Sequence, residues 1–486
     1  MRWIDVKRIP IRAGTERSLS ALLAFLADCR AVAASDGHPR LVSVSLESNH
    51  LDPLAVLESI YEPDALHFYV EQPARRVALA GAEEVVGRAF EGPDRFEQAR
   101  AFIRETFNHT IATGDLDLPL AGPRFFCSFG FFDDSDPHAA FPPARVFVPR
   151  WQVMRSADRF CAVANCLVEA DSDVTALAER IWRAHAKFRS FDYSSLTGAA
   201  RGETRKGRPS GENPVPVEVG PPDHFKQSVS LALGDITSGR FRKVVLARAV
   251  DVTTSSDLHP LAALNRLRER YPDCYSFSVG NGRGQSFIGA TPERLVQVTG
   301  RSIETEALAG STRRGESALE DGMLVRQLLN SDKDIREQRL VLDSIVRRLE
   351  GLGVAARGSE RIGVLQLSNV QHLHTPIKAA LPDGIDLLRL VEELHPTPAV
   401  GGTPRTAASR RIRELEPFQR GLYAAPLGWI DADGDGEFVV GIRSALIDGS
   451  KARVYAGAGI VDGSDAEREY AETELKLRAL LDNLFG

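Results

Sequence analysis

The chain has 486 residues, of which 43% are apolar and 26% are charged, and its formal net charge is -6. This balance is typical of a globular protein with enough apolar material for a core, and a domain usually takes roughly 100–200 residues, so the length allows one or two domains. The acidic net charge and the lack of a long Lys or Arg run argue against nucleic acid as a partner.

Apolar runs in the chain are short. A typical one, Leu19–Ala27, falls well below the roughly 20 residues that cross a bilayer, and the sequence opens without a signal-peptide pattern. These features predict a cytoplasmic protein without a membrane partner. The five cysteines have no C-x-x-C spacing, which indicates neither a disulfide framework nor a zinc site. We expect small buried side chains at Cys29, Cys127, Cys161, Cys166 and Cys274.

The first 200 residues mix strand and helix patterns without a motif that carries chemistry. Strands are predicted at Leu41–Leu46, Phe125–Phe132 and Ala144–Val148, and helices at Leu19–Ala34, Asp94–Thr113 and Val174–Phe188. A stretch rich in Gly, Pro and charge follows, which is typical of a linker. We therefore expect an N-terminal α/β extension over 1–200 that packs on the rest, a linker over 201–222 and a second domain over 223–486.

Strand and helix patterns after the linker follow one another in irregular order. Helices are predicted at Asp223–Ser238, Glu320–Gly351 and Asp465–Leu484, and strands at Lys243–Arg248, Tyr275–Val279, Arg294–Val298, Val439–Ala445 and Arg453–Ala458. Regular strand–helix–strand alternation is missing, which favours an α+β fold over a doubly wound parallel sheet.

Four acidic residues form two pairs on the predicted long helices. Asp334 and Glu337 make one pair, and Glu469 and Glu472 make the other. Each pair has i,i+3 spacing, so both of its carboxylates project from one helical face. Two such faces opposed across a cleft suit Mg²⁺, which prefers oxygen ligands and keeps several waters. Spacing alone leaves open the alternative that these acids are solvated surface charges.

The segment Tyr455–Val461 is predicted to be a strand that runs into a Gly-rich bend before a helix. Gly457 and Gly459 would let the backbone approach a ligand closely, and exposed N–H groups at such a bend would bind an anion. A dinucleotide site is not indicated, because a third glycine and a following strand–helix–strand unit are missing.

Lys243 and Glu293 lie at predicted strand starts, and each has two interpretations. Lys243 either extends to solvent or, if it is buried, favours the neutral amine that acts as a base. Glu293 is either a turn residue or a carboxylic acid that an apolar site keeps neutral. His372 and His374 have no acid or Cys at metal-ligand spacing, so we interpret them as buried or site-lining histidines.

Between Asp223 and Leu484 a series of motifs stands in unbroken order: KVVLAR, GATPERL, EALAGSTRRG, SDKDIREQ, VQHLHTPI, LHPTPAVGGTPR, EPFQRGLYAAPLGW, GEFVVGIRSAL and AGAGIVDGSDAEREYAETELK. This series resembles the chorismate-binding family, which includes isochorismate, salicylate, anthranilate and aminodeoxychorismate synthases. FFCSFGFFDD and ARVFVPRWQ resemble, more loosely, the extension of longer isochorismate synthases. The resemblance implies an α+β fold with a large antiparallel β-sheet sandwich flanked by helices, and a catalytic domain over 223–486.

The resemblance also implies a metal site. Glu337 and Glu472 match the family's two Mg²⁺ ligands, and Asp334 and Glu469 match the acids that support them through metal-bound waters. The family role therefore coincides with the helical pairing of these four acids.

A binding site for chorismate is implied by the same motifs. An arginine and a tyrosine hold the substrate carboxylates in the family, at positions that match Arg443 and Tyr423. Arginine suits this role because its planar fork of donors meets a carboxylate with two hydrogen bonds. The other implied substrate contacts are Gly310, Ser311, His372, Gly457, Gly459 and Lys476.

Single positions distinguish the members of the family. Members that use water carry a lysine where Lys243 stands, whereas members that use ammonia carry Gln, so no glutaminase subunit is expected. Ala309 stands where one class of aminodeoxychorismate synthase carries a nucleophilic lysine. Ala399 resembles the isochorismate type, because salicylate synthases tend to have Thr there.

These positions predict a magnesium-dependent isochorismate synthase in which Lys243 is the base and Glu293 is the acid. The alternatives are a salicylate synthase, which also releases pyruvate, and a non-catalytic partner subunit. The sequence does not distinguish menaquinone from siderophore biosynthesis, and it does not fix the oligomeric state.

Overall fold

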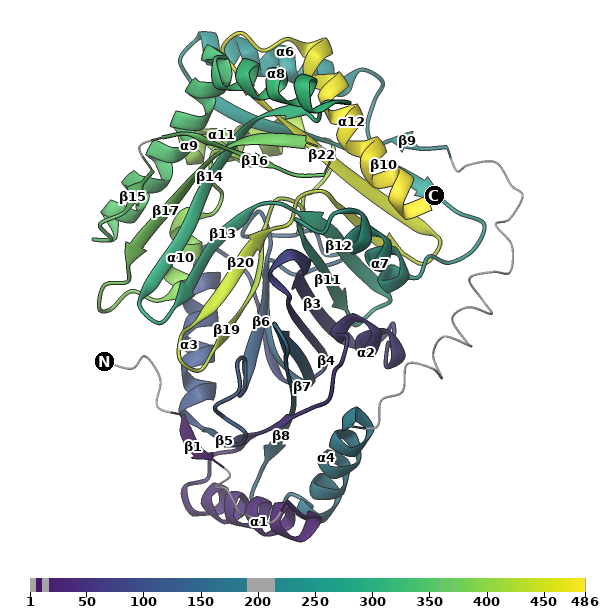
Figure 1. Cartoon of the computed structure of the whole chain (residues 1–486), viewed down its shortest axis with the longest axis vertical. Coiled ribbons are helices and arrows are strands. Elements are labelled where there is room, and N and C mark those ends of the chain that lie inside the picture. The colour runs from purple at the N-terminus through teal and green to yellow at the C-terminus, as the bar shows by residue number, and fades with distance from the viewer. Residues whose placement is uncertain (1–5, 11–16, 190–214, 360, 369, 486) are drawn as a thin grey trace.

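The computed structural model describes residues 6–10, 17–189, 215–359, 361–368 and 370–485 (Figure 1). The expected linker, 201–222, lies outside the described residues as far as residue 214. Within the described part, 22 strands join into one hydrogen-bonded sheet, with helices against its outer surfaces.

The strands are β1 (Lys7–Pro10), β2 (Arg40–Glu47), β3 (Leu66–Gln72), β4 (Val77–Phe90), β5 (Thr110–Gly114), β6 (Arg124–Phe129), β7 (Ala144–Ser156), β8 (Arg159–Val168), β9 (Val217–Glu218), β10 (Lys243–Thr253), β11 (Tyr275–Asn281), β12 (Gln285–Thr291), β13 (Arg294–Thr299), β14 (Ser302–Arg313), β15 (Arg357–Gly358), β16 (Gly363–Gln366), β17 (Val370–Ala380), β18 (Gly402–Thr403), β19 (Pro426–Asp431), β20 (Gly436–Val440), β21 (Ser444–Asp448) and β22 (Lys451–Val461). The helices are α1 (Leu19–Asp36), α2 (Pro53–Ser59), α3 (Arg95–Asn108), α4 (Val174–Arg189), α6 (His224–Thr237), α7 (Pro260–Arg270), α8 (Ala318–Leu329), α9 (Asp332–Gly351), α10 (Leu387–Leu394), α11 (Arg405–Leu415) and α12 (Ala466–Phe485).

The sheet divides at β7, which pairs with both β4 and β6. One branch runs through β4, β3, β11, β12, β21, β22 and β10, and the other runs through β6, β19, β20, β13, β14 and β17. All of these pairings are antiparallel. The pairings of β3 with β11 and of β6 with β19 join residues on either side of the expected linker.

The two branches pack face to face through aromatic side chains. Phe68 on β3 stacks on Phe126 of β6 with ring centroids 4.7 Å apart, and both rings are buried. Burial of such large apolar surfaces is the main stabilising contribution in a sandwich of this kind. The predicted α+β fold with a large antiparallel β-sheet sandwich and flanking helices is therefore confirmed.

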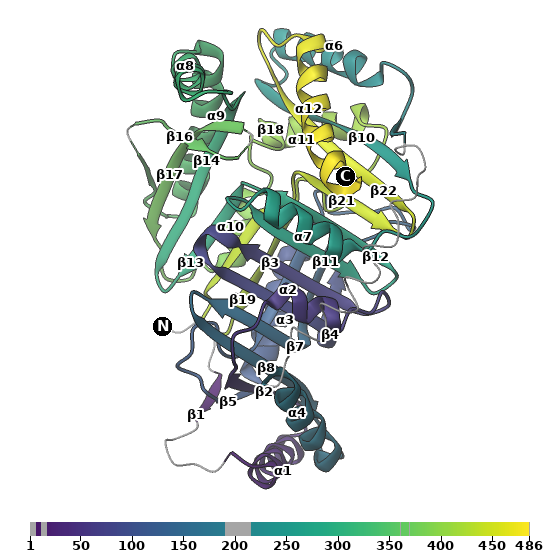
Figure 2. The same cartoon turned by 45° about the vertical axis from the view of Figure 1, so that its right-hand side comes forward.

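Helices cover the outer surfaces of the sheet. Helix α9 contacts β14 and β17, whereas α6 and α12 contact β22, so the two groups stand on different parts of the molecule (Figure 2). At the other end, α1 contacts β2 and β8, and α4 contacts β8. No helix among the described residues combines the length and the apolar character that a membrane span requires. The five cysteines are buried free thiols, as expected.

Two predicted helices end earlier than expected. The single helix predicted at Glu320–Gly351 is wrong, because α8 stops at Leu329 and α9 begins at Asp332. Ser331 between them is extended and its side chain accepts the N–H of Asp334, which caps α9. The helix predicted to continue to Thr113 is also wrong, since α3 ends at Asn108 and β5 takes up the next residues in pairing with β2.

Candidate active site

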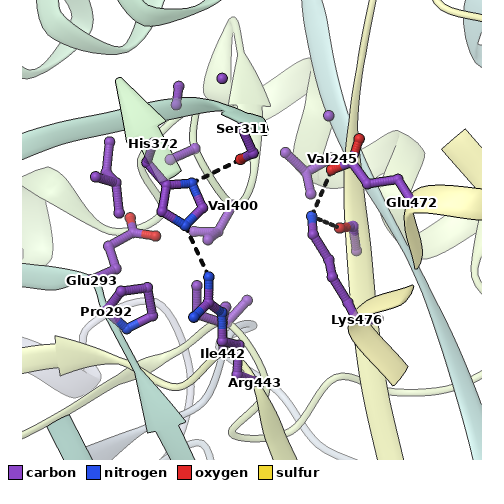
Figure 3. A pocket seen from close by; sticks show the side chains of 18 of the residues that line it. Val245, Pro292, Glu293, Ser311, His372, Val400, Ile442, Arg443, Glu472 and Lys476 are labelled. Atoms are coloured by element: carbon purple, nitrogen blue, oxygen red, sulfur yellow. Dashed lines mark hydrogen bonds and ion pairs between the residues drawn. The ribbon is translucent and has the colours of Figure 1, made fainter. Parts of the chain in front are cut away.

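Side chains from α9, α12, β14, β17 and β22 line one cavity of about 150 Å³ (Figure 3). Ala309 and Ala399, the positions that distinguish family members, line it as well. Lys243 is not among the lining residues but contacts one of them, Glu337. The cavity brings together most of the predicted site residues, namely Glu293, Gly310, Ser311, Asp334, Glu337, His372, Tyr423, Arg443, Gly457, Gly459, Glu469, Glu472 and Lys476.

Lys243 is the first residue of β10 and is buried, with 1% of its side chain exposed. It does not extend to solvent, because β10 is paired on one side with β22 and, at this end, also with β18. Its Nζ lies 2.7 Å from Oε1 of Glu337. A buried polar group is costly unless it is hydrogen-bonded, so the contact with Glu337 holds this lysine at the wall of the cavity.

Glu293 lies between β12 and β13 and is buried. Its N–H donates to Oγ1 of Thr291 and its carbonyl accepts the N–H of Val440, so the backbone is fixed on both sides. Burial and, second, the negative charge of Glu306 raise the pKa of Glu293 to about 8. Of the two interpretations of this residue, the structure therefore favours a carboxylic acid that is neutral at pH 7.

Three of the four predicted acids are each paired with a lysine. Besides the pair of Glu337 with Lys243, Glu472 Oε1 lies 2.7 Å from Nζ of Lys476. Glu469 Oε1 lies 3.1 Å from Nζ of Lys333, a cavity residue that was not among the predicted site residues. Lys333 precedes Glu337 by four residues on the same face of α9, and this spacing could have indicated Lys333 as a site residue.

The acids differ in their tendency to ionise. The charge of Lys476 lowers the pKa of Glu472 even though burial opposes it. Burial raises the pKa of Asp334, and the charge of Glu337 adds to this. The described His, Cys, Asp and Glu side chains form no ready-made cluster of three metal ligands. Mg²⁺ takes only one or two carboxylates and keeps several waters, so four acids along one cavity fit such an ion without a closed cage.

Gly457 and Gly459 lie inside β22, so the predicted Gly-rich bend is wrong. They pair with Ala247 and Val245 of β10, and this pairing keeps the backbone extended where glycine alone favours a turn. A Cβ at position 459 would stand 2.7 Å from Oε1 of Glu337. A Cβ at position 457 would stand 2.8 Å from the hydroxyl of Tyr423. A side chain at either position would therefore displace Glu337 or Tyr423.

Arg443 stands at a break in what was predicted to be one strand. That prediction is wrong, because β20 ends at Val440 and β21 begins at Ser444, with Arg443 in the left-handed region at φ 50°. Apolar residues stand on both sides of the break, as at Val440, Ile442 and Ala445, so apolar composition carries no signal of it. The break lets the guanidinium of Arg443 reach His372 inside the cavity (Figure 3).

His372 links Arg443 to Ser311. Its Nε2 lies 2.9 Å from Nη2 of Arg443, and its Nδ1 lies 2.7 Å from Oγ of Ser311. Burial and the charge of Arg443 hold the pKa of His372 well below its usual value, so the ring is neutral. Arginine only donates, so Nε2 accepts and the Nδ1–H donates to Ser311. Gly310 beside it has φ 72° and forms a bulge in β14.

Tyr423 is buried and stacks on Tyr455, with ring centroids 5.0 Å apart and planes 17° from parallel. Burial raises the pKa of the Tyr423 phenol, so it remains a neutral hydrogen-bond donor. The cavity therefore combines neutral donors, a guanidinium, ammonium groups and carboxylates.

Comparison with known proteins identifies the family. The family model of the chorismate binding enzyme matches residues 24–485. The chain belongs to the chorismate-binding enzyme family. The predicted resemblance is thus confirmed.

Relatives of this chorismate-binding enzyme span most of its length. It is 36% identical over 455 residues to the salicylate biosynthesis isochorismate synthase of Pseudomonas aeruginosa, covering 92% of this chain and 90% of that protein. It is 31% identical over 460 residues to isochorismate synthase MenF of Bacillus subtilis, covering 92% and 94%. The solved structure of the menaquinone-specific isochorismate synthase MenF from Escherichia coli superposes with a TM-score of 0.74 at 26% identity, covering 97% of this chain and 100% of that one.

Proposed function

We propose that this enzyme is an isochorismate synthase, which converts chorismate to isochorismate for menaquinone or siderophore biosynthesis. The observation that carries the proposal is a buried lysine, Lys243, at the wall of a cavity that also contains a carboxylic acid, Glu293, whose pKa is raised to about 8. A base and an acid in one site are what simultaneous proton removal and proton donation require. The names of the relatives in Pseudomonas aeruginosa and Bacillus subtilis support the same reaction.

In the proposed reaction, Lys243 in its neutral form takes a proton from a water molecule, whose oxygen bonds to ring carbon C2 of chorismate. The ring double bonds shift, and the C4–O bond breaks. Glu293 gives its proton to the departing C4 hydroxyl, which leaves as water. One water enters and one leaves, so the product is an isomer of the substrate. Each proton transfer contributes typically 10²–10⁴-fold in rate when the groups are well placed.

Arg443, Tyr423 and Lys476 supply the donors for the two carboxylates of chorismate. Arg443 provides a planar fork, which His372 orients by accepting one of its N–H groups. The backbone at Gly310–Ser311 and at Gly457–Gly459 borders the same cavity and completes the proposed substrate site.

Glu337 and Glu472 are the proposed Mg²⁺ ligands, and Asp334 and Glu469 support them through waters. A bound Mg²⁺ supplies Lewis-acid stabilisation of the C1 carboxylate and of charge on the ring. These acids also face positive groups, since Lys243, Lys333 and Lys476 pair with Glu337, Glu469 and Glu472 in turn.

Product analysis tests the function. Purified protein is incubated with chorismate and Mg²⁺, with and without an ammonium salt, and the products are separated by chromatography. Isochorismate is the expected product. Salicylate together with pyruvate would identify a salicylate synthase, ammonia-dependent anthranilate would identify a synthase that needs a glutaminase, and no product would favour a non-catalytic subunit. Each of these three results contradicts the proposal.

The first expected effect of Glu337→Gln is weaker binding of Mg²⁺. Loss of one carboxylate charge at a two-carboxylate site raises the Mg²⁺ concentration for half-maximal rate by about 10-fold or more. Mg²⁺ titration of the rate measures this, with Glu350→Gln at the exposed end of α9 as the control. Activity that persists in chelator in both the parent and the variant would remove the metal assignment.

Gly459→Ala is expected to lower kcat/KM by about 10–100-fold, because a misplacement of roughly 1 Å in a catalytic group has an effect of this size. The added methyl group would stand 2.7 Å from Glu337 Oε1 and 3.2 Å from Lys243 Cε. Gly351→Ala is the control, since nothing lies within 4 Å of a Cβ there. Steady-state kinetics and thermal melting of both variants check this. Equal kcat/KM values for Gly459→Ala and Gly351→Ala would mean that the Lys243–Glu337 pair tolerates displacement.

A further inference from the structure

Glu306 on β14 is a carboxylate just outside the cavity that the proposed reaction does not use. Its Oε2 lies 2.8 Å from Nε2 of His374 on β17, and its Oε1 accepts the backbone N–H of Arg294 at 3.3 Å. The amide of Arg294 belongs to the peptide bond that joins it to Glu293. The Glu306 carboxylate is therefore anchored on the same backbone that carries the proposed acid.

The surroundings of Glu293 contain charges of both signs. Lys243 of β10 and Arg443, between β20 and β21, favour ionisation of Glu293, whereas Glu306 of β14 opposes it. The neutral phenol of Tyr423 also borders this site. Glu306 is thus the negative group that offsets two neighbouring cations.

Glu306 itself stays ionised. Its burial favours the protonated form, but the hydrogen bond with His374 and the charge of Arg294 outweigh burial and hold the pKa of Glu306 below its usual value. When two carboxyl groups share a site of low dielectric constant and hydrogen bonds stabilise the anion of one of them, the proton stays on the other. Glu306 is hydrogen-bonded to His374 and accepts the N–H of Arg294, so Glu293 holds the proton even with Lys243 and Arg443 nearby.

We propose that Glu306, fixed by His374 and by the Glu293–Arg294 peptide, is a positioning residue that keeps the proton on Glu293 until it is delivered to the leaving hydroxyl. The delivery rests on the proposed function, whereas the placement of the proton does not. Glu306 acts through Glu293, and its negative charge is the property that matters. A merely structural role would depend on the hydrogen bonds of Glu306 and not on its charge.

Glu306→Gln separates these two roles, because a glutamine keeps a carbonyl acceptor and the side-chain volume but loses the charge. We expect the alkaline apparent pKa of kcat to fall from near 8 to near 7, which lowers the rate at pH 8 about fivefold, with KM for chorismate changed less than about twofold. Glu304→Gln is the matched control for loss of a charge beside Arg294: this acid lies two residues earlier on β14 and pairs with Lys378 at 2.8 Å and with Arg294 at 3.4 Å. An unmoved alkaline limb in Glu306→Gln, or an equal shift in Glu304→Gln, overturns the proposal.

A second readout does not depend on turnover. The infrared carboxyl band of protonated Glu293, assigned by its absence in Glu293→Gln, is titrated in the full-length protein and in Glu306→Gln. A lowered midpoint in Glu306→Gln supports the inference even if isochorismate is not the product, whereas an unchanged midpoint overturns it even if isochorismate is formed. Should Glu306→Gln not fold, His374→Leu removes the hydrogen bond that keeps Glu306 ionised. A lower and broader midpoint is then expected, and a midpoint unchanged from the parent rejects the inference.

Discussion

Replacing Lys243 with alanine is expected to lower kcat for isochorismate formation by about 100- to 10,000-fold, the usual contribution of one well-placed base. Chorismate affinity should stay within about threefold of the parent, because the proposed carboxylate contacts come from other side chains, led by Arg443 and Tyr423. Rates measured by chromatography and binding measured by calorimetry separate the two effects.

Two controls make the Lys243→Ala experiment specific. Lys226→Ala removes a lysine outside the cavity, which pairs with Glu467 at 2.8 Å, and should leave kcat unchanged. Added methylamine should partly restore water addition to Lys243→Ala, since a small amine fits the space left by the side chain and acts as the base. Turnover at the parent rate in Lys243→Ala would remove the base assignment. Loss of activity without any amine rescue would indicate that the lysine mainly positions Glu337.

Glu293→Gln should lower kcat by about 100- to 10,000-fold, because glutamine has no proton to give to the C4 hydroxyl. The pH profile provides a more specific signature. A general acid works in its protonated form, so activity is present below the pKa of Glu293, near 8, and is lost as the pH rises through it. The residual activity of Glu293→Gln should therefore lack this alkaline limb.

The matched control for Glu293→Gln is Glu437→Gln. Glu437 is also a carboxyl group whose pKa is raised by burial, but it lies outside the cavity and accepts a hydrogen bond from the hydroxyl of Tyr275 at 2.7 Å. This variant should keep both the rate and the alkaline limb. An alkaline limb that survives in Glu293→Gln would assign it to another group and would reject Glu293 as the acid.

Much of the site was predictable because its residues lie in motifs that keep their order along the chain. The i,i+3 spacing of Glu469 and Glu472 correctly placed both acids on one cavity wall, on α12. Spacing could not show that Lys243 is buried, since that depends on β18 and β22, which come more than 150 residues later. Glu306 was missed for the same reason, because its role arises only from contact with other strands.

The wrong boundaries of the predicted helices and strands share a physical cause. Apolar periodicity reports which face of an element is buried, but it carries no signal for a break that keeps the same face inward. Ser331 caps α9 directly after α8 has ended, and Arg443, in the left-handed region, separates β20 from β21. Gly457 and Gly459 show the opposite effect, since strand pairing with β10 overrides their local preference.

Water addition at C2 with loss of the C4 hydroxyl is the central claim, and labelling with oxygen-18 water tests it most directly. The enzyme is incubated with unlabelled chorismate and Mg²⁺ in labelled water, and the product is examined by mass spectrometry and carbon NMR. We predict isochorismate with one labelled oxygen, located on the new C2 hydroxyl. Isochorismate without label would mean that the original hydroxyl is transferred within the molecule, and that result would contradict the roles given to Lys243 and Glu293.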